Sequence, residues 1–133
     1  MGKEFDITPV DVPKVETQYR RIVTQIPHPD SVKTLESLHQ SEPISMRGQP
    51  PVVWERAEDC QVYDKHGNMW LDWSSGVLVT NAGHGMPEVR QAIIDQVNSG
   101  LLHNYVFPSE ERAELAAFLI DVAPEGMDKV FLL

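Results

Sequence analysis

Residues 63–89 read YDKHGNMWLDWSSGVLVTNAGHGMPEV and join a hairpin-like segment, a glycine-rich loop and the start of a helix. The turn at residues 65–68 contains a glycine, which adopts positive φ without strain, and the flanking aromatic and apolar residues favour β-strands. The loop at residues 74–85 contains three glycines, and Pro87 then stands where the first residue of a helix is expected. This stretch predicts two paired strands, a shaped loop and a helix, in that order.

A third strand is expected just upstream of this hairpin. The runs at residues 52–54, 60–63 and 69–73 are all rich in β-branched and aromatic residues. The turn residues between the second and third runs are those of an antiparallel connection. We therefore expect a three-stranded antiparallel meander.

Two helices are expected downstream of the loop. Val89, Ile93 and Val97 recur every fourth residue, and Gly100 follows where that helix should end. The second helix is expected to begin at Ser109, because a proline precedes it and two glutamates follow at the positive end of the helix dipole. Its pattern predicts a buried stripe of four apolar side chains: Leu115, Phe118, Leu119 and Val122.

The last five residues, KVFLL at positions 129–133, predict a buried strand of the parallel-sheet type. A natural domain seldom ends on such a strand, because the strand needs neighbours on both edges. We therefore expect the chain to be an incomplete part of a larger α/β fold. We also expect that it does not fold stably alone.

The first 51 residues differ from the rest in containing seven of the ten prolines. Proline removes a backbone donor and fixes φ, so this segment cannot be a continuous helix or a central strand. Short helices are possible at residues 15–24 and 31–39, the second capped by Asp30 or Ser31. The segment is therefore predicted to be an extended arm with short helical pieces.

Composition excludes several classes of function. The net charge of −9 opposes binding to a nucleic-acid backbone. No apolar run reaches the length of a membrane span, and the N-terminus lacks the pattern of a secretory signal. The single cysteine, Cys60, excludes an internal disulfide and fits a reducing compartment, so a cytoplasmic location is expected.

The residues themselves predict no complete catalytic set. Ser74 lacks the flanking glycines of a nucleophile elbow, and Gly83-His84-Gly85 lacks the length and lysine of a phosphate-binding loop. Cys60 lies in a strand-like run and is expected to be a small buried hydrophobe. No pair among the five histidines matches a zinc pattern, so no metal site is predicted; they stand at positions 28, 39, 66, 84 and 103.

The stretch at residues 63–89 closely resembles class III pyridoxal-phosphate-dependent aminotransferases, of the 4-aminobutyrate, acetylornithine and omega-amino acid type. That family shows a D-x-x-G-x-x-(Y/W)-(I/L)-D hairpin, then a glycine, a few apolar residues, and N-x-G-H before a helix. All of these occur here in order, and the similarity continues through residues 102–105 and 124–131. It covers residues 50–133 well and the preceding arm more loosely.

The resemblance implies the N-terminal part of the aspartate-aminotransferase-type fold. The expected division is an arm at residues 1–50, the N-terminal part of the small domain at 51–108, and the start of the large cofactor domain at 109–133. It also implies a homodimer that uses pyridoxal 5'-phosphate. Such an enzyme moves an amino group from an amine or omega-amino acid to a keto acid.

The resemblance also assigns residues of the substrate pocket. Ser75 and Gly76 are expected to shape the backbone on the amine side, and Val77 and Leu78 to line it. Tyr105 stands near the position of a further pocket aromatic. The alternative for the last three is ordinary packing. If Val77 does line the pocket, its small side chain would leave room for an extended omega-amino chain.

No catalytic or cofactor-binding residue is assigned within the chain. In the family the phosphate-binding turn, the lysine that holds the cofactor and the aspartate facing its ring nitrogen all follow the last strand. Lys129 begins that strand and is no candidate for the cofactor lysine. The chain alone is therefore expected to be inactive. An aminomutase or decarboxylase of the same fold, or a non-catalytic fragment acting by association, stays open.

Overall fold

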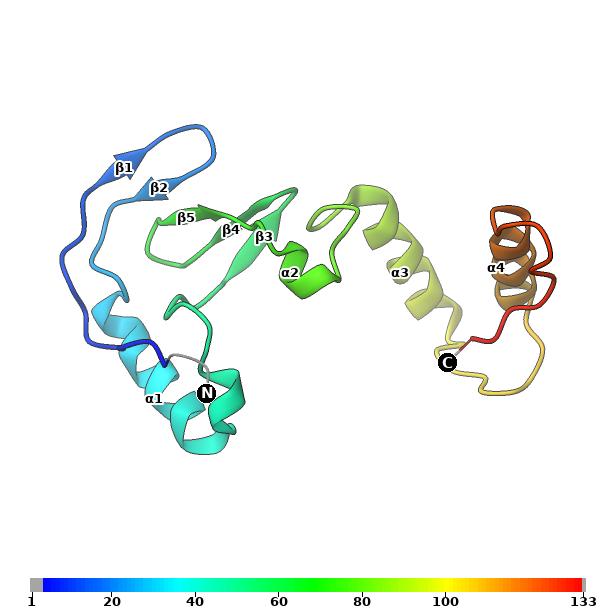
Figure 1. Ribbon diagram of the computed structural model, residues 1–133, viewed down its shortest axis with the longest axis horizontal. Helices are drawn as coiled ribbons and strands as arrows, with labels where there is room; N and C mark the ends of the chain where they lie inside the picture. Colours follow the sequence, from blue (N-terminus) through cyan, green and yellow to red (C-terminus); the bar gives the residue numbers. More distant parts are fainter. Residues whose placement is uncertain (1–3, 133) are drawn as a thin grey trace. The chain divides into compact units, whose positions relative to one another are not determined.

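The computed structural model describes residues 4–132. They divide into two compact units, Met1–Arg90 (unit 1) and Gln91–Leu133 (unit 2). Among the described residues there are five short strands, which form one antiparallel sheet, and four α-helices (Figure 1). At this level the expected α/β class is confirmed.

The sheet lies entirely in unit 1 and has the strand order β1-β2-β5-β4-β3. Each neighbouring pair is antiparallel, and Val62 pairs with Trp70 at the centre of the β4–β5 ladder. In chain order the strands are β1 (Val15–Glu16), β2 (Arg21–Ile22), β3 (Arg56–Glu58), β4 (Gln61–Tyr63) and β5 (Met69–Leu71).

The helix predicted at residues 15–24 is wrong, because this segment forms the β1–β2 hairpin. At its turn the Thr17 hydroxyl accepts a hydrogen bond from the Arg20 N–H and donates one to the Arg20 carbonyl, both at 3.0 Å. Such local side-chain bonds compete with helix formation. Pairing of Arg21 with Met69 then joins the hairpin to the sheet, a contact that local sequence does not encode.

The antiparallel meander is confirmed, but its first strand is displaced from the predicted residues 52–54 to β3. Glu58 pairs with Gln61 across a two-residue turn in which Asp59 has φ of 51°. A tight turn fixes which residues pair, so the strand must begin beside it. The aromatic and β-branched run therefore lies before the paired residues.

Polar hydrogen bonds join the arm to the meander in unit 1. The fully buried Asn68 accepts from the backbone N–H groups of Val23 and Thr24, at 2.8 and 3.2 Å, through its side-chain oxygen. Its amide nitrogen donates to Thr24 Oγ1 and Asp64 Oδ2, each at 2.7 Å. The apolar core around it is small and consists of Ile22, Leu35, Val62 and Met69.

Three longer helices occur close to their predicted positions: α1 (Val32–Ser41), α3 (Pro87–Ser99) and α4 (Glu110–Asp121). Pro87 is the first residue of α3, and Gly100 follows it with φ of 78°. The Ser109 hydroxyl caps α4 by accepting from the Arg112 N–H at 3.3 Å. Ser31 occupies the N-cap position of α1 but makes no capping bond.

Two predictions about burial and pairing are wrong for the described residues. In the expected stripe of α4, Leu115, Phe118 and Val122 are exposed and Leu119 is only half-buried. Residues 129–132 form no strand, and Leu133 lies outside the described residues. A helix face is buried only against another element, and a strand needs a neighbour to bond with. Neither is supplied by the described part of unit 2.

Candidate functional site

The loop after β5 is organised by the carboxylate of Asp72. Its Oδ1 accepts hydrogen bonds from the Ser74 N–H and hydroxyl, at 2.9 and 2.7 Å. Its Oδ2 accepts from the Gly76 N–H and lies 2.7 Å from His84 Nε2. The Asp72 side chain is only 3% exposed, so these partners replace the water that a carboxylate would otherwise bind.

These bonds keep Asp72 ionised. Burial by itself would raise the pKa of Asp72, but the hydrogen bonds from His84, Ser74 and Gly76 outweigh it and lower the pKa from 3.8 to about 2. An ionised carboxylate only accepts hydrogen bonds, so His84 donates from Nε2. The pair therefore ties the start of the loop to its end.

His84 is held from two further sides. Its backbone exchanges two hydrogen bonds with Asp59, at 2.7 and 2.8 Å, which attaches the loop to the β3–β4 turn. The Trp54 ring meets the imidazole edge-on, with centroids 5.9 Å apart. At Gly83, whose φ is 90°, a Cβ atom would stand 3.1 Å from Asp59 Oδ1, so only glycine fits without displacement.

Between these anchors, α2 (Ser75–Leu78) is a left-handed turn. The φ angles of its four residues are 51°, 59°, 64° and 66°. Left-handed backbone costs roughly 1–2 kcal/mol for each residue with a side chain, and more strain is expected at the β-branched Val77. The bonds to Asp72, and that from the Leu78 N–H to the Ser74 carbonyl at 2.8 Å, hold this conformation.

The predicted pocket residues divide between the two units. Ser75 and Gly76 are half-buried, whereas Val77 and Leu78 are 67% and 79% exposed, so neither is a core residue of the described chain. Tyr105 belongs to unit 2, where it has φ of 49° and lines an open hollow of about 1000 Å³. The structure thus brings four of the five residues together on one turn.

The residue that the sequence analysis missed is Asp72, together with its partner His84. Gly83-His84-Gly85 was considered only as a phosphate-binding loop, and the histidine was given no role. The available signal was a carboxylate directly after a strand, with a histidine in the same glycine-rich loop. Their pairing across twelve residues depends on how that loop folds back.

The described residues do not fit a pyridoxal-phosphate site by themselves. The backbone N–H groups of Gly83 and His84 donate to the carbonyls of Thr80 and Asp59, at 2.9 and 2.7 Å, and are not free for a phosphate. The described lysines, at positions 14, 33, 65 and 129, are all exposed on the surface.

Comparison with known proteins supplies the family. The model of the family "Aminotransferase class-III" matches residues 44–133, a segment that contains the whole Asp72–His84 loop. The chain belongs to this family. Three relatives that are named as aminotransferases or transaminases support the assignment of this chain to the class-III family.

A [LysW]-aminoadipate semialdehyde transaminase of Deinococcus radiodurans is 33% identical over 81 residues, which are 61% of this chain and 19% of the relative. An acetylornithine aminotransferase of Methanopyrus kandleri is 33% identical over 81 residues, 61% of this chain and 21% of its own length. A putrescine–pyruvate aminotransferase of Pseudomonas aeruginosa is 37% identical over 78 residues, which are 57% of this chain and 17% of the relative. The class-III chain thus spans about a fifth of these relatives. None of its described helices has the length and apolar character needed to span a bilayer.

Proposed function

We propose that this chain is part of a pyridoxal-phosphate-dependent enzyme that moves an amino group from an amine or omega-amino acid to a keto acid. The observation that carries the proposal is the class-III family match over residues 44–133. The names of the three relatives all specify amino-group transfer, and one specifies putrescine and pyruvate. In such enzymes the cofactor supplies the bond-breaking chemistry, and the protein binds and orients the reactants.

The proposed architecture is the aspartate-aminotransferase-type fold in a homodimer. Residues 1–50 would form its arm, 51–108 part of its small domain, and 109–133 the start of its large domain. As the resemblance to the family implies, the proposal places the cofactor on residues outside this chain. The chain by itself would then be inactive.

Within that enzyme, the α2 turn is proposed to form one wall of the pocket that binds the amine. Asp72 and His84 fix the backbone on both sides of the turn, so the exposed Val77 and Leu78 side chains are held out toward solvent. Backbone strain of this kind persists only where the surroundings enforce it, and it is concentrated at functional sites. A preorganised apolar wall would bind the carbon chain of the amine while excluding water from it.

The test is to enlarge Val77 in the full-length enzyme. Val77→Phe is expected to lower kcat/KM for a long diamine by about tenfold and to affect a short amine less, because the added ring fills the space for the extended chain. Phenylalanine is not β-branched, so the left-handed backbone is no more strained than with valine. The matched control is Val79→Phe, which alters another exposed valine just after the turn, with φ of −115°.

Equal kinetics of both variants with both amines would overturn the role of the turn. Product analysis separates the reaction classes in the same assay. A new keto acid or aldehyde together with a new amino acid supports transamination. Release of carbon dioxide would instead indicate a decarboxylase of the same fold. An isomerised amino acid formed without an amino acceptor would indicate an aminomutase.

A further inference from the structure

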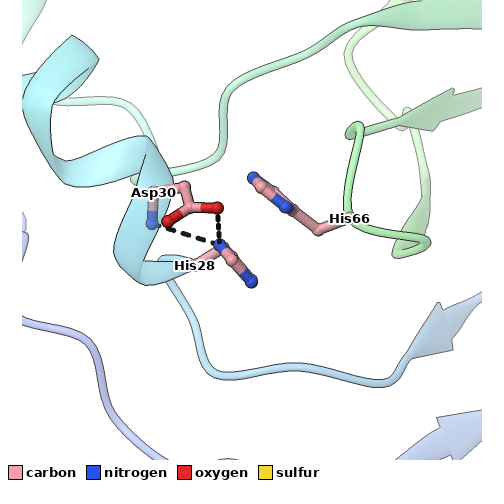
Figure 2. A group of neighbouring side chains, drawn as sticks. All are labelled: His28, Asp30 and His66. Atoms are coloured by element: carbon pink, nitrogen blue, oxygen red, sulfur yellow. Dashed lines mark hydrogen bonds and ion pairs between the residues drawn. The ribbon is translucent and has the colours of Figure 1, made fainter.

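Two histidines and an aspartate that belong neither to the α2 turn nor to the Asp72–His84 loop meet in unit 1. His28 and Asp30 stand at the start of the 3₁₀ turn Pro29–Ser31 before α1, and His66 lies in the turn between β4 and β5. One nitrogen or oxygen atom from each of the three lies within 4.8 Å of the others (Figure 2). The three residues are called the His28–His66 cluster below.

Hydrogen bonds fix the backbone that carries His66 and join its ring to the arm. The His66 N–H donates to Asp64 Oδ1 at 2.9 Å, and Asp64 is itself buried and bonded to Asn68. His66 Nε2 lies 3.3 Å from the hydroxyl of the buried Ser31. The cluster is therefore supported from both the arm and the meander, as a site that binds a ligand with defined geometry requires.

A metal ion would have to displace one existing hydrogen bond at His28. His28 Nδ1 accepts the Asp30 N–H at 3.1 Å, so in the neutral ring this nitrogen carries no proton but its single lone pair is engaged in that bond. The Asp30 carboxylate lies 3.8 Å from the same nitrogen and is 72% exposed, which leaves it free to turn. Figure 2 shows the two rings stacked face to face, with the Asp30 carboxylate beside the His28 ring.

We propose that the His28–His66 cluster binds a divalent transition-metal ion of the Zn²⁺ type. Two imidazoles and one carboxylate are a ligand set that such ions prefer, and three protein ligands leave a position for water. The sequence could not show this site, because its ligands come from two segments nearly forty residues apart and follow no short zinc pattern. The proposal is independent of aminotransferase chemistry.

Binding requires a defined rearrangement. The two imidazole rings are stacked, with centroids 3.5 Å apart and planes 10° from parallel. A metal ion binds in the plane of an imidazole at about 2.0–2.1 Å from its nitrogen, so one ion cannot lie in both planes while the rings are parallel. The rings must tilt and Asp30 must swing inward. Loss of stacking is therefore a specific sign of metal binding, whereas a purely structural stack would remain.

The test is calorimetric titration of Zn²⁺ into the chelator-treated full-length enzyme, with matched variants. We expect one equivalent to bind, with affinity reduced at least tenfold in His28→Gln and in His66→Gln, and less in Asp30→Asn. His39→Gln is the control, because His39 also has a carboxylate neighbour, Glu4 at 3.7 Å, but belongs to no cluster of three such ligands among the described residues. It should bind Zn²⁺ as the wild type does.

A second measurement needs no variant and so does not depend on the variants' folding. Zn²⁺ should shift the imidazole NMR resonances of His28 and His66 together, and leave those of His39 and His103 in place. Binding that is unchanged in His28→Gln and His66→Gln would overturn the proposal. The absence of wild-type binding at 100 µM Zn²⁺ would also overturn it. This concentration is about the dissociation constant of a weak site, whose binding free energy is on the order of 5 kcal/mol.

Discussion

The two units of the chain differ in what holds them together. All of the side chains that are buried among the described residues lie in unit 1, where three of the eight are polar: Ser31, Asp64 and Asn68. In the described part of unit 2, α4 and the segments around it bury none. The side-chain hydrogen bonds of unit 1 reach across up to 46 residues, as from Arg21 to Gly67, whereas those given for unit 2 stay within seven residues.

This difference teaches that an amphipathic pattern predicts a helix but not its burial. The apolar residues of α4 recur as in a core-facing helix, yet Phe118 remains 61% exposed. In unit 1 the four apolar side chains of the core are buried, and the polar bonds of Asn68 hold the hairpin and the meander together around them. Three predictions test this contrast.

The largest effect is expected from Asn68→Ala. Its loss leaves the N–H groups of Val23 and Thr24 and the Asp64 carboxylate without their buried partner, so the free energy of unfolding should fall by about 3 kcal/mol. Urea unfolding of the full-length enzyme, monitored by tryptophan fluorescence, measures it. Asn98→Ala, on the exposed surface of α3, is the control and should stay within about 0.5 kcal/mol of wild type. Equal losses in both variants would remove the contrast between the units.

A valine pair sharpens the comparison for apolar burial. Val62 is 2% exposed and Val97 is 55% exposed. Val62→Ala should lower the free energy of unfolding by about 2 kcal/mol through lost burial and the cavity left behind. Val97→Ala should be neutral or should stabilise by up to about 0.5 kcal/mol, since alanine is the better helix former. A large loss in Val97→Ala would mean that the face of α3 is covered in solution.

The smallest effect is expected from Asp72→Asn, and it depends on pH. The pKa of Asp72 is lowered from 3.8 to about 2, so the ionised group stabilises the fold above about pH 4 and this contribution disappears as the pH falls toward about 2. At pH 6 the variant should be less stable by about 1.5 kcal/mol, from the loss of hydrogen bonds to a charged group. The gap to wild type should close between about pH 4 and pH 2. A gap that stays constant would contradict the ionised state of Asp72.

Some of the fold could be predicted because neighbouring residues decide it. The glycine turn at Gly67 fixes the β4–β5 hairpin, and Pro87 and Ser109 mark the helix starts. The hairpin at residues 15–24 could not be predicted in this way. Its residues suit a short helix or a hairpin almost equally, and the choice depends on Met69 and Asn68 more than forty residues away.

The candidate site shows the same division. The motif placed Ser75, Gly76, Val77 and Leu78 together in one loop, and they do lie on one turn. It did not show the left-handed backbone of that turn. Three of its four residues carry side chains that disfavour this conformation, so no local preference predicts it. Their role in binding an amine stays a prediction.

The sequence by itself determined the family, the α/β class, the hairpin turn and the positions of the long helices. These follow from motif order, from glycine and proline stereochemistry and from helical periodicity, all of which are local. Only the tertiary structure decided that Asp72 is tied to His84, that Asn68 joins the arm to the sheet, and that His28 meets His66. Each of these contacts joins segments whose approach depends on the folding of the chain between them, and local preferences do not specify that.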